Sequence, residues 1–312
     1  MSDKIEVVST NVSKEKGTIK EPVAQIEFNE LGIIDDAHAG DWHRQISMLG
    51  QESVERFALK AGRTIAPGEF AENLTLRGLD FSTLRLLDRF RFGEVELEMT
   101  QIGKKCHGDS CAIFREVGAC VMPKEGVFCR VIHGGTVRSG DAVEYLPKHY
   151  RFWVITLSDR ASRGEYSDRS GPRVVEHIEA FAEKRHGLRA EINTTLLADD
   201  AEALAAELTR ARKAGADVII TTGGTGVGPR DIAPEVVSDF CDKLVPGVME
   251  AIRLKYGQKK PNALLSRSVA GVAGSTLVYA IPGSVRAVDE YLNEIVTTMP
   301  HLLHMLVGLD NH

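Results

Sequence analysis

The chain has 312 residues, of which 43% are hydrophobic, so it is long enough for two domains with ordinary apolar cores. Its formal net charge of −6 gives no basic footprint for nucleic acid, so we expect no nucleic-acid partner. The first residues lack the apolar core of a signal peptide, and no apolar run approaches the roughly 20 residues that span a bilayer. We therefore expect a cytoplasmic protein with no membrane partner.

Residues 1–147 are predicted to form a β-rich domain. Short runs with partial period-two alternation are separated by Gly, Pro and Asp residues that favour turns. These runs are 23–28, 94–99 and 127–132. One helix is predicted at 50–59, with Val54, Phe57 and Ala58 on its apolar face. The pattern favours a curled sheet or barrel over a parallel sheet.

Four of the five cysteines lie in this first half, at Cys106, Cys111, Cys120 and Cys129. In a cytosolic protein, such a cluster indicates chemistry, metal binding or burial rather than a disulfide framework. Together with His107 they are a candidate zinc set. However, four residues separate Cys106 from Cys111, wider than the usual two-residue knuckle, and Cys129 falls in an alternating strand. The zinc hypothesis is therefore the weaker alternative.

Beyond a short polar joint at Lys148, strands and helices alternate along the chain. Predicted strands are 152–157, 191–197, 218–222 and 275–281, and predicted helices are 170–184, 201–214, 235–241, 247–256, 285–297 and 302–307. This alternation predicts a mostly parallel sheet with helices on both faces. We therefore predict two domains, 1–147 and 148–312, of which the second is a three-layer α/β domain.

A glycine-rich loop follows the buried strand Val218–Thr222. Four glycines within residues 223–228 permit positive φ and let backbone amides approach an anion. Asp231 follows, and Pro234 suits the first turn of a helix. The loop could cradle phosphate, or it could simply turn the chain. Polar clusters also follow the other three predicted parallel strands, and ligands gather at the carboxyl ends of such strands.

The motifs of the second half resemble those of the molybdopterin adenylyltransferases, the family of the gephyrin amino-terminal domain, over about residues 151–308. They are 156–160, 164–172, 197–200, 222–226 with 229–235, 265–267 and 281–284. The resemblance implies a nucleotidyltransferase of molybdenum cofactor biosynthesis, which moves AMP from ATP to the terminal phosphate of molybdopterin and releases pyrophosphate. It also implies Mg²⁺ as cofactor and a homotrimeric assembly.

The same resemblance assigns candidate site residues. Asp199 and Asp231 are the implied catalytic acids, which would position Mg²⁺, a cation that prefers hard oxygen ligands. The amides of Gly223, Gly224, Thr225 and Gly226 would hold phosphate, and the implied pterin and phosphate contacts are Ser158, Asp159, Ser266, Arg267, Gly283 and Ser284. Structural roles are open alternatives: a helix cap for Asp199, a turn or cap for Asp231, a surface pair for 266–267 and a turn for 282–284.

The first half resembles a MOSC domain, the module at the carboxyl end of molybdenum cofactor sulfurases, over about residues 20–147. The motifs are 36–47, 67–75, 100–107 and 140–141. The resemblance implies binding of the molybdenum-carrying pterin cofactor and a sulfur-carrying Cys106, whose positive neighbours would favour the thiolate. A structural cysteine near a turn is the alternative for Cys106. His38 and His43, which flank Gly40, could bind an anion or serve a helix entry or the core.

We therefore predict a bifunctional cofactor-assembly protein. Its second domain would adenylylate molybdopterin, and its first would bind the cofactor and carry sulfur. Because the sulfurase's own catalytic domain is absent, separate sulfur-donor and molybdenum-insertion proteins would be its partners. The alternative is a non-catalytic molybdopterin-binding or scaffold protein, which would bind the pterin without ATP-dependent transfer of AMP.

Overall fold

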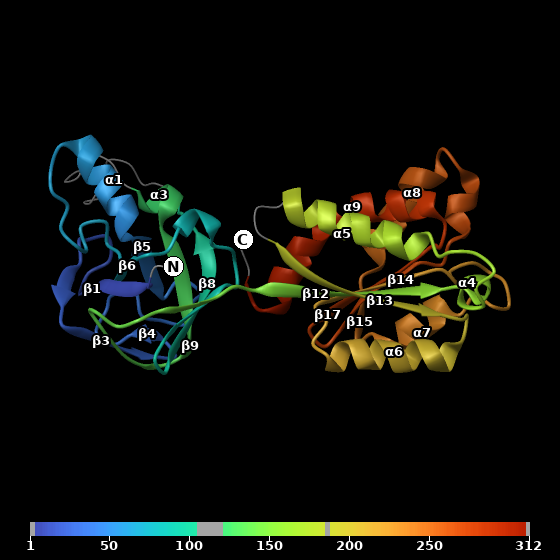
Figure 1. Ribbon diagram of the computed structural model, residues 1–312, viewed down its shortest axis with the longest axis horizontal. Helices are drawn as coiled ribbons and strands as arrows, with labels where there is room; N and C mark the ends of the chain where they lie inside the picture. The colour runs from blue at the N-terminus through green and yellow to red at the C-terminus, as the bar shows by residue number, and fades with distance from the viewer. Residues whose placement is uncertain (1–3, 105–120, 185–187, 310–312) are drawn as a thin grey trace. The chain divides into compact units, whose positions relative to one another are not determined.

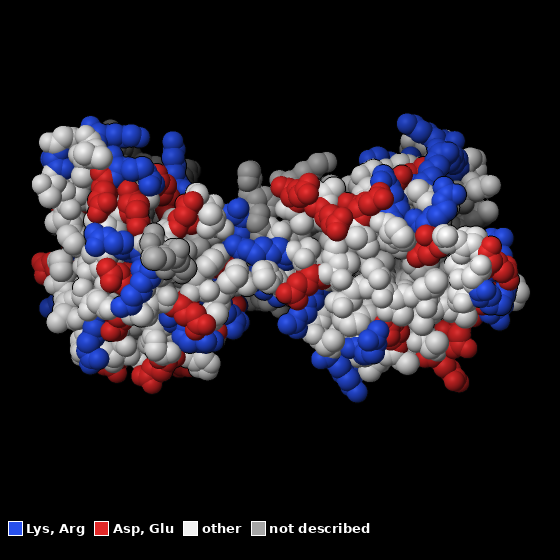
Figure 2. Space-filling view, viewed as in Figure 1, with Lys and Arg blue, Asp and Glu red and all other residues white. Residues whose placement is uncertain are grey.

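The structure is a computed structural model that describes residues 4–104, 121–184 and 188–309. The chain divides into two compact units, Met1–Lys148 and His149–His312 (Figure 1). On the face shown in Figure 2, Lys and Arg side chains lie among Asp and Glu on both units. None of the helices in the described ranges is both long and apolar enough to cross a membrane.

In the first unit, the described strands form two sheets around one core. The strands are β1 (Glu6–Val12), β2 (Glu21–Val23), β3 (Gln25–Asn29), β4 (Gly32–Ile33), β5 (Ile46–Gly50), β6 (Leu74–Arg77), β7 (Arg89–Phe92), β8 (Val95–Ile102), β9 (Val127–His133), β10 (Gly135–Arg138) and β11 (Glu144–Leu146). The larger sheet has the order β11-β7-β8-β9-β5-β6-β1-β2 and the smaller one β10-β3-β4. Ile26 and Val137 of the smaller sheet share a buried cluster with Leu97 of the larger one. The predicted strand-rich first domain is confirmed, in its curled-sheet form.

The helix that follows β5 confirms the predicted apolar face. Helix α1 (Gln51–Ala61) buries Val54 and packs Phe57 and Ala58 against a second small cluster. It ends at Gly62, whose left-handed φ of 64° suits a helix C-terminus. Two shorter elements complete the described helices of this unit, η1 (Phe81–Thr83) and α3 (Met122–Glu125).

The described strands of the second unit form one mostly parallel sheet in the order β13-β12-β14-β17-β16-β15. Their bounds are β12 (His149–Leu157), β13 (Arg189–Leu197), β14 (Val218–Thr222), β15 (Lys243–Leu244), β16 (Val269–Ala273) and β17 (Thr276–Ile281). The first four strands in the sheet order are parallel, and β16 and β15 are antiparallel additions. Thr222 pairs with Thr156 on one side and with Ile281 on the other, so the carboxyl ends of the parallel strands meet at one edge.

Helices cover both faces of this sheet and confirm the predicted three-layer α/β architecture. They are α4 (Asp159–Ser162), α5 (Ser170–Lys184), α6 (Ala201–Lys213), α7 (Ala233–Phe240), α8 (Pro246–Gly257), η3 (Pro261–Leu265) and α9 (Val285–Leu306). Figure 1 shows α5, α8 and α9 on one face and α6 and α7 on the other. Residues Trp153 and Ile219 of the sheet pack against Leu204 and Val237 of the second helical layer.

The prediction that two separate helices close the second unit is wrong. The sequence suggests two closing helices, 285–297 and 302–307, but a single helix α9 runs through Pro300. Proline cannot donate a backbone hydrogen bond and costs about 3 kcal/mol inside a helix. The buried side chains of Ile295, Met299 and Leu303 nevertheless continue at helical spacing across the proline. Burial of each stabilises the helix by about 1.5–3 kcal/mol, which together outweighs the proline.

Candidate active site

Two clefts lie at the carboxyl edge of the parallel strands. The first, of about 490 Å³, lies against the glycine-rich loop, and we call it the loop cleft. The second, of about 430 Å³, lies at the end of β12 and is lined by Ser158, Tyr166 and Asp168; we call it the β12 cleft. Gly283 and Ser284 line both clefts. The strand ends therefore form a site with two adjoining compartments.

The loop after β14 requires glycine at its first position. Gly223 has a φ of 107°, and a Cβ there would lie 2.3 Å from the carbonyl oxygen of Leu157. Gly224 also has a positive φ, of 61°. Gly283 approaches from β17, since a Cβ on it would lie 3.0 Å from the Cα of Gly223. Side chains at these positions would push apart the backbones that form the floor of the site.

The predicted phosphate cradle needs one correction. The amide of Gly223 donates a hydrogen bond to the carbonyl of Ile281, with an N···O distance of 3.0 Å, so it is committed to joining β14 to β17. In the described part of the chain, the amides of Gly224, Thr225 and Gly226 have no hydrogen-bond partner. The Gly223 amide is therefore not free to bind phosphate, whereas the next three amides are, and glycine spacing alone did not predict this difference.

Asp199 is not the cap of the helix that follows it. Helix α6 is capped by Asp200, whose carboxylate accepts the amide of Ala203 at 2.8 Å. Asp199 instead accepts the amide of Asp159 at 3.0 Å, and Asp159 accepts the amide of Asp199 at 3.1 Å. Burial, followed by the negative charges of Asp159 and Asp231, raises the pKa of Asp199 above its usual value. The helix-cap alternative for Asp199 is therefore wrong.

Asp199 and Asp231 flank the glycine-rich loop. The Oδ1 atom of Asp199 lies so close to Gly224 that a Cβ there would be 3.4 Å from it. The Oδ2 atom of Asp231 would lie 2.7 Å from a Cβ on Gly226, and it accepts the amide of Gly228 at 2.8 Å. Asp231 thus acts as a turn residue and also presents its carboxylate beside the loop.

Each of these two acids has one uncommitted carboxylate oxygen. Within the described ranges, Oδ1 of Asp199 and Oδ1 of Asp231 accept no hydrogen bond. Mg²⁺ is usually held by one or two carboxylates, with waters and substrate phosphates as its other ligands, so this donor set fits Mg²⁺. No group of three His, Cys, Asp or Glu side chains within the described residues could hold a metal ion alone. The arrangement suits a metal site that the substrate completes.

The carboxylate of Asp159 is paired with Arg230, which follows the glycines of the loop. Arg230 forms an ion pair with this carboxylate at 2.6 Å, and this hydrogen bond lowers the pKa of Asp159 below its usual value. The side chain of Asp159 therefore lies beside Asp199, with its charge already balanced by Arg230.

The predicted serines reach the clefts and also hold local structure. Ser158 lines the β12 cleft, caps α4 and lies 2.9 Å from the hydroxyl of Tyr166. Ser284 caps α9 at the junction of the two clefts. Ser266 lines the loop cleft and is hydrogen-bonded to Ser268 at 2.6 Å. Capping and ligand contact are compatible, because a hydroxyl both donates and accepts.

Arg267 has a different environment from the one expected. Its guanidinium donates to the carbonyl oxygens of Gly226 at 2.6 Å and Asp231 at 2.8 Å, and also to the carboxylate of Glu235. The side chain therefore holds the loop, and the surface-pair alternative for Ser266 and Arg267 is wrong.

Several residues that line the loop cleft were missed by sequence reasoning. Glu290 on α9 accepts hydrogen bonds from Lys260 and Arg286, each at 3.0 Å. Tyr291 lines the same cleft, and its buried hydroxyl has no hydrogen-bond partner in the described structure. The spacing of Arg286 and Glu290, four residues apart after a Pro-Gly-Ser turn, is a signal that could have identified this wall.

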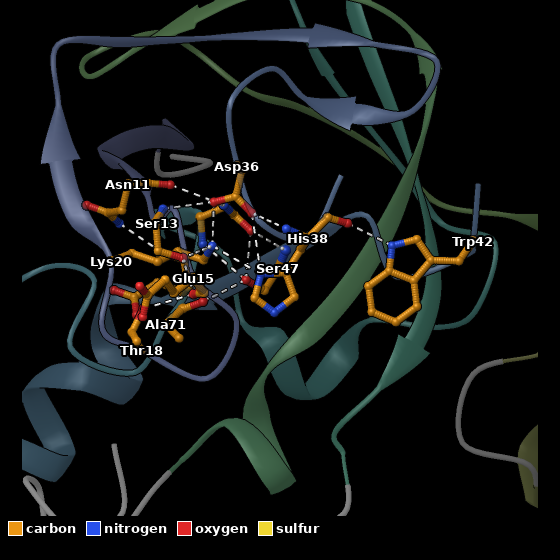
Figure 3. Close-up of polar contacts among 12 residues, drawn as sticks. Asn11, Ser13, Glu15, Thr18, Lys20, Asp36, His38, Trp42, Ser47 and Ala71 are labelled. Atoms are coloured by element: carbon orange, nitrogen blue, oxygen red, sulfur yellow. Dashed lines mark hydrogen bonds and ion pairs between the residues drawn. The ribbon is translucent and has the colours of Figure 1, made fainter. Parts of the chain in front are cut away.

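In the first unit, a buried cluster of polar contacts around Asp36 joins two predicted motifs (Figure 3). Asp36 accepts hydrogen bonds from Lys20 Nζ at 2.5 Å and Asn73 Nδ2 at 3.1 Å, and from the amides of Ser13 at 3.0 Å and His38 at 2.9 Å. Burial alone would raise the pKa of Asp36, but the hydrogen bonds of His38 and Lys20 hold it well below its usual range. Burial lowers the pKa of Lys20 despite the carboxylate. The hydrogen bond from Asn73 fixes the start of the 36–47 motif against the 67–75 motif.

The two histidines of that motif lie in the connection between β4 and β5, so the helix-entry alternative is wrong. The carbonyl of His38 accepts the indole N–H of Trp42 at 2.8 Å. Burial lowers the pKa of His43, and its carbonyl accepts the hydroxyl of Thr100. Figure 3 shows His38 between the ion pair and Trp42.

The predicted cysteine cluster is only partly described. Cys106, Cys111 and Cys120, with His107, lie outside the described residues. Cys129 is fully buried in β9, and burial raises the pKa of its thiol well above the usual value. Cys129 is therefore a core residue.

Comparisons with known proteins agree with both halves of this architecture. Residues 153–304 match the family described as a probable molybdopterin binding domain, and residues 35–144 match the MOSC domain. A molybdopterin adenylyltransferase of Helicobacter pylori is 31% identical over 156 residues, which cover 50% of this chain and 86% of the relative. That of Pyrococcus furiosus is 35% identical over 162 residues, which cover 50% and 91%.

Larger relatives are matched over a smaller share of their length. Gephyrin of Dictyostelium discoideum is 32% identical over 157 residues, which cover 49% of this chain and 22% of gephyrin. Among solved structures, the tungsten cofactor synthesizing protein MoaB of Pyrococcus furiosus is 33% identical and covers 51% of this chain and 98% of its own, with a TM-score of 0.46. Through its second unit, this chain belongs to the family of the molybdopterin adenylyltransferases, and it carries a MOSC domain ahead of that unit.

Proposed function

We propose that the second unit transfers AMP from Mg-ATP to the terminal phosphate of molybdopterin. The observation that carries this proposal is the pair of acids, Asp199 and Asp231, that flank the glycine-rich loop, each with a free carboxylate oxygen. Unpaired amides of the loop lie between them, beside the loop cleft. Curated relatives that the chain covers nearly in full are named for this reaction.

In this reaction, a phosphate oxygen of molybdopterin attacks the α-phosphorus of ATP. The bond between that phosphorus and the bridging oxygen breaks, and pyrophosphate leaves. Because both reactants are anions, catalysis depends on positioning and on neutralisation of charge. The amides of Gly224, Thr225 and Gly226 would bind phosphate oxygens, and Asp199 and Asp231 would hold Mg²⁺. When bound, Mg²⁺ supplies positive charge against the phosphate oxygens.

The test is incorporation of α-labelled AMP into molybdopterin by purified protein. We expect Asp199→Asn and Asp231→Asn each to lower transfer by about 100-fold or more, since each removes an anionic ligand. The matched control is Asp200→Asn, which should keep both the α6 cap and the activity, because Asn caps helices as well as Asp does. Chelation by EDTA should abolish transfer and added Mg²⁺ should restore it.

Two outcomes would contradict the proposal. Equal losses in Asp199→Asn and Asp200→Asn would show that a structural defect, rather than a missing ligand, causes the effect. Tight binding of molybdopterin without any transfer by the wild type would instead indicate a non-catalytic binding or scaffold protein.

We also propose that the first unit binds the cofactor and carries sulfur on Cys106. The match to the MOSC family supports this role. After incubation with a persulfide donor, mass spectrometry should find added sulfur on Cys106 and none on the buried Cys129. The same amount of added sulfur in Cys106→Ser would rule out this role.

A further inference from the structure

A set of donors holds the carbonyl side of the glycine-rich loop. The carbonyl of Gly224 accepts the amide of Ala233 at 3.1 Å, and that of Thr225 accepts the amide of Arg267 at 2.9 Å. The carbonyl of Gly226 accepts Nε–H of Arg267 at 2.6 Å. Three successive carbonyls are thus bound by donors from α7 and from the residues before β16. We call these donors the carbonyl clamp.

The clamp determines which way the loop amides face. The described chain has no cis peptide bonds, so the N–H of each peptide group points away from the C=O of the same group. The carbonyls of residues 224–226 share peptide groups with the amides of Thr225, Gly226 and Val227. These three amides therefore face away from the clamp, and none has a hydrogen-bond partner in the described part of the chain. Thr225 and Gly226 line the loop cleft.

The side chain of Arg267 also fixes an acid of the proposed site. Its Nη2 donates to the carbonyl of Asp231 at 2.8 Å, and its Nη1 donates to the carboxylate of Glu235. The carboxylate of Asp231 packs against Gly226, whose carbonyl is bound by the same guanidinium. One side chain thus fixes the peptide group that carries the free amide of Val227 relative to Asp231.

We infer that Arg267 is a positioning residue that aims the amides of Gly226 and Val227 at the phosphates of the nucleotide, the first through its own backbone N–H and the second through its guanidinium. It does so by occupying the opposite side of the loop, and its donors to Gly226, Asp231 and Glu235 leave its charge committed within the protein. This inference rests on the proposed function, because it names how that site binds the triphosphate of ATP.

The test compares Arg267→Lys with Arg267→Met. Lysine keeps the charge but lacks the planar guanidinium donors that reach two carbonyls. Both variants should therefore weaken pyrophosphate binding and AMP transfer to a similar extent. We expect pyrophosphate binding, measured by calorimetry, to weaken about 10-fold or more, as for the loss of one to two hydrogen bonds to a charged ligand. For AMP transfer, kcat should fall more than KM rises. If Arg267→Lys instead kept nearly wild-type pyrophosphate affinity while Arg267→Met lost it, the inference would be overturned in favour of direct contact through charge.

Two further measurements separate positioning from a folding defect. Added guanidine should restore part of the pyrophosphate binding of Arg267→Ala, since it can refill the clamp, whereas a misfolded variant would not respond. The matched control is Arg253→Lys, because Arg253 on α8 donates to the carbonyl of Ser268 at 3.1 Å without contacting the loop. It should bind pyrophosphate within about 2-fold of the wild type, a change of less than 0.5 kcal/mol.

The calorimetric readout also distinguishes failure of this inference from failure of the proposed function. Wild-type protein that binds pyrophosphate but transfers no AMP would overturn the proposed function and leave the role of Arg267 intact. Unchanged pyrophosphate binding in both Arg267→Lys and Arg267→Met would overturn the role of Arg267, whatever the AMP-transfer assay showed.

Discussion

The buried ion pair of Lys20 and Asp36 should respond unequally to loss of its two members. Neither side chain is exposed, and Nζ lies 2.5 Å from Oδ2. In Lys20→Met, the Asp36 carboxylate would keep the amides of Ser13 and His38 and the side chain of Asn73. In Asp36→Asn, the ammonium would keep the Ser13 hydroxyl at 3.2 Å and face the ring of His38 at 3.5 Å. The Lys20 ammonium in Asp36→Asn therefore keeps fewer and longer hydrogen bonds than the Asp36 carboxylate in Lys20→Met.

The expected magnitudes follow from this difference. Removing one partner of a buried ion pair typically costs about 3–5 kcal/mol, because the other charge is left uncompensated. Asp36→Asn should lie at the upper end of that range, at about 4–5 kcal/mol. Lys20→Met should lie at the lower end of the range, at about 3 kcal/mol, because three hydrogen-bond donors remain on the carboxylate.

The Asp36→Asn variant should also gain stability as the pH rises. Burial lowers the pKa of Lys20 from 10.5, and this variant lacks the Asp36 carboxylate, which opposes the shift more than Glu72 does. Between the lowered folded pKa and 10.5, the unfolded chain binds more protons than the folded one, so the free energy of unfolding increases with pH. Lys20→Met lacks the group and should show no such increase.

Urea unfolding followed by tryptophan fluorescence would measure both effects. The chain has two tryptophans, and Trp153→Phe leaves Trp42 as a reporter of the first unit. Trp42 is well placed, because its indole binds the carbonyl of His38 beside the ion pair. The reasoning would be refuted if Lys20→Met destabilised the first unit as much as Asp36→Asn, or if Asp36→Asn showed no recovery as the pH was raised towards 10.5.

Three further predictions concern the second unit. The hydrogen bond from Arg210 is the largest cause that lowers the pKa of Glu207 from 4.5 to about 2, so stability should be lost as the pH falls from 4.5 towards 2. Glu207→Gln should remove this loss of stability at low pH and lower the free energy of unfolding by about 1–3 kcal/mol at neutral pH. Urea midpoints measured as a function of pH would show whether the variant still loses stability in acid. Gly223→Ala should lower AMP transfer about 10-fold or more, because its Cβ would lie 2.3 Å from the carbonyl of Leu157; near-normal kcat would contradict the predicted clash. Pro300→Ala should raise the free energy of unfolding by about 1–2 kcal/mol, since alanine restores a helical N–H donor. A decrease, measured by thermal unfolding, would mean that the proline stabilises the fold at this position.

Local signals predict much of the second unit. Strand β14 has the predicted bounds, Val218–Thr222, because an unbroken apolar and β-branched run meets two glycines. Strand β16, Val269–Ala273, is not predicted, because a short run rich in Ala and Gly has weak β propensity by itself. It becomes a strand through antiparallel pairing with β17, and a tertiary contact of this kind leaves no local signal.

The candidate site is predictable in position but not in its hydrogen bonds. Parallel strands bring their polar ends to one edge, so Ser158, Ser284 and the glycine-rich loop line adjoining clefts as expected. The loop carbonyls of Gly224, Thr225 and Gly226 are bound by Ala233 and Arg267, and Arg267 is distant from the loop in sequence. Neither the commitment of the Gly223 amide nor the role of Arg267 could therefore be read from the motifs that contain them.

Two pairs of adjacent residues divide their roles between the fold and the ligand. Asp200 turns back to cap α6, whereas Asp199, one residue earlier, faces the loop. Arg230 forms an ion pair with Asp159, whereas Asp231, one residue later, packs its carboxylate against Gly226. In each pair, the structural residue fixes the backbone that carries its neighbour, so the acid can keep an oxygen free. In the proposed site, Asp199 and Asp231 each accept one backbone amide and keep the second carboxylate oxygen for a metal, while their neighbours supply the cap of α6 and the cation that pairs with Asp159.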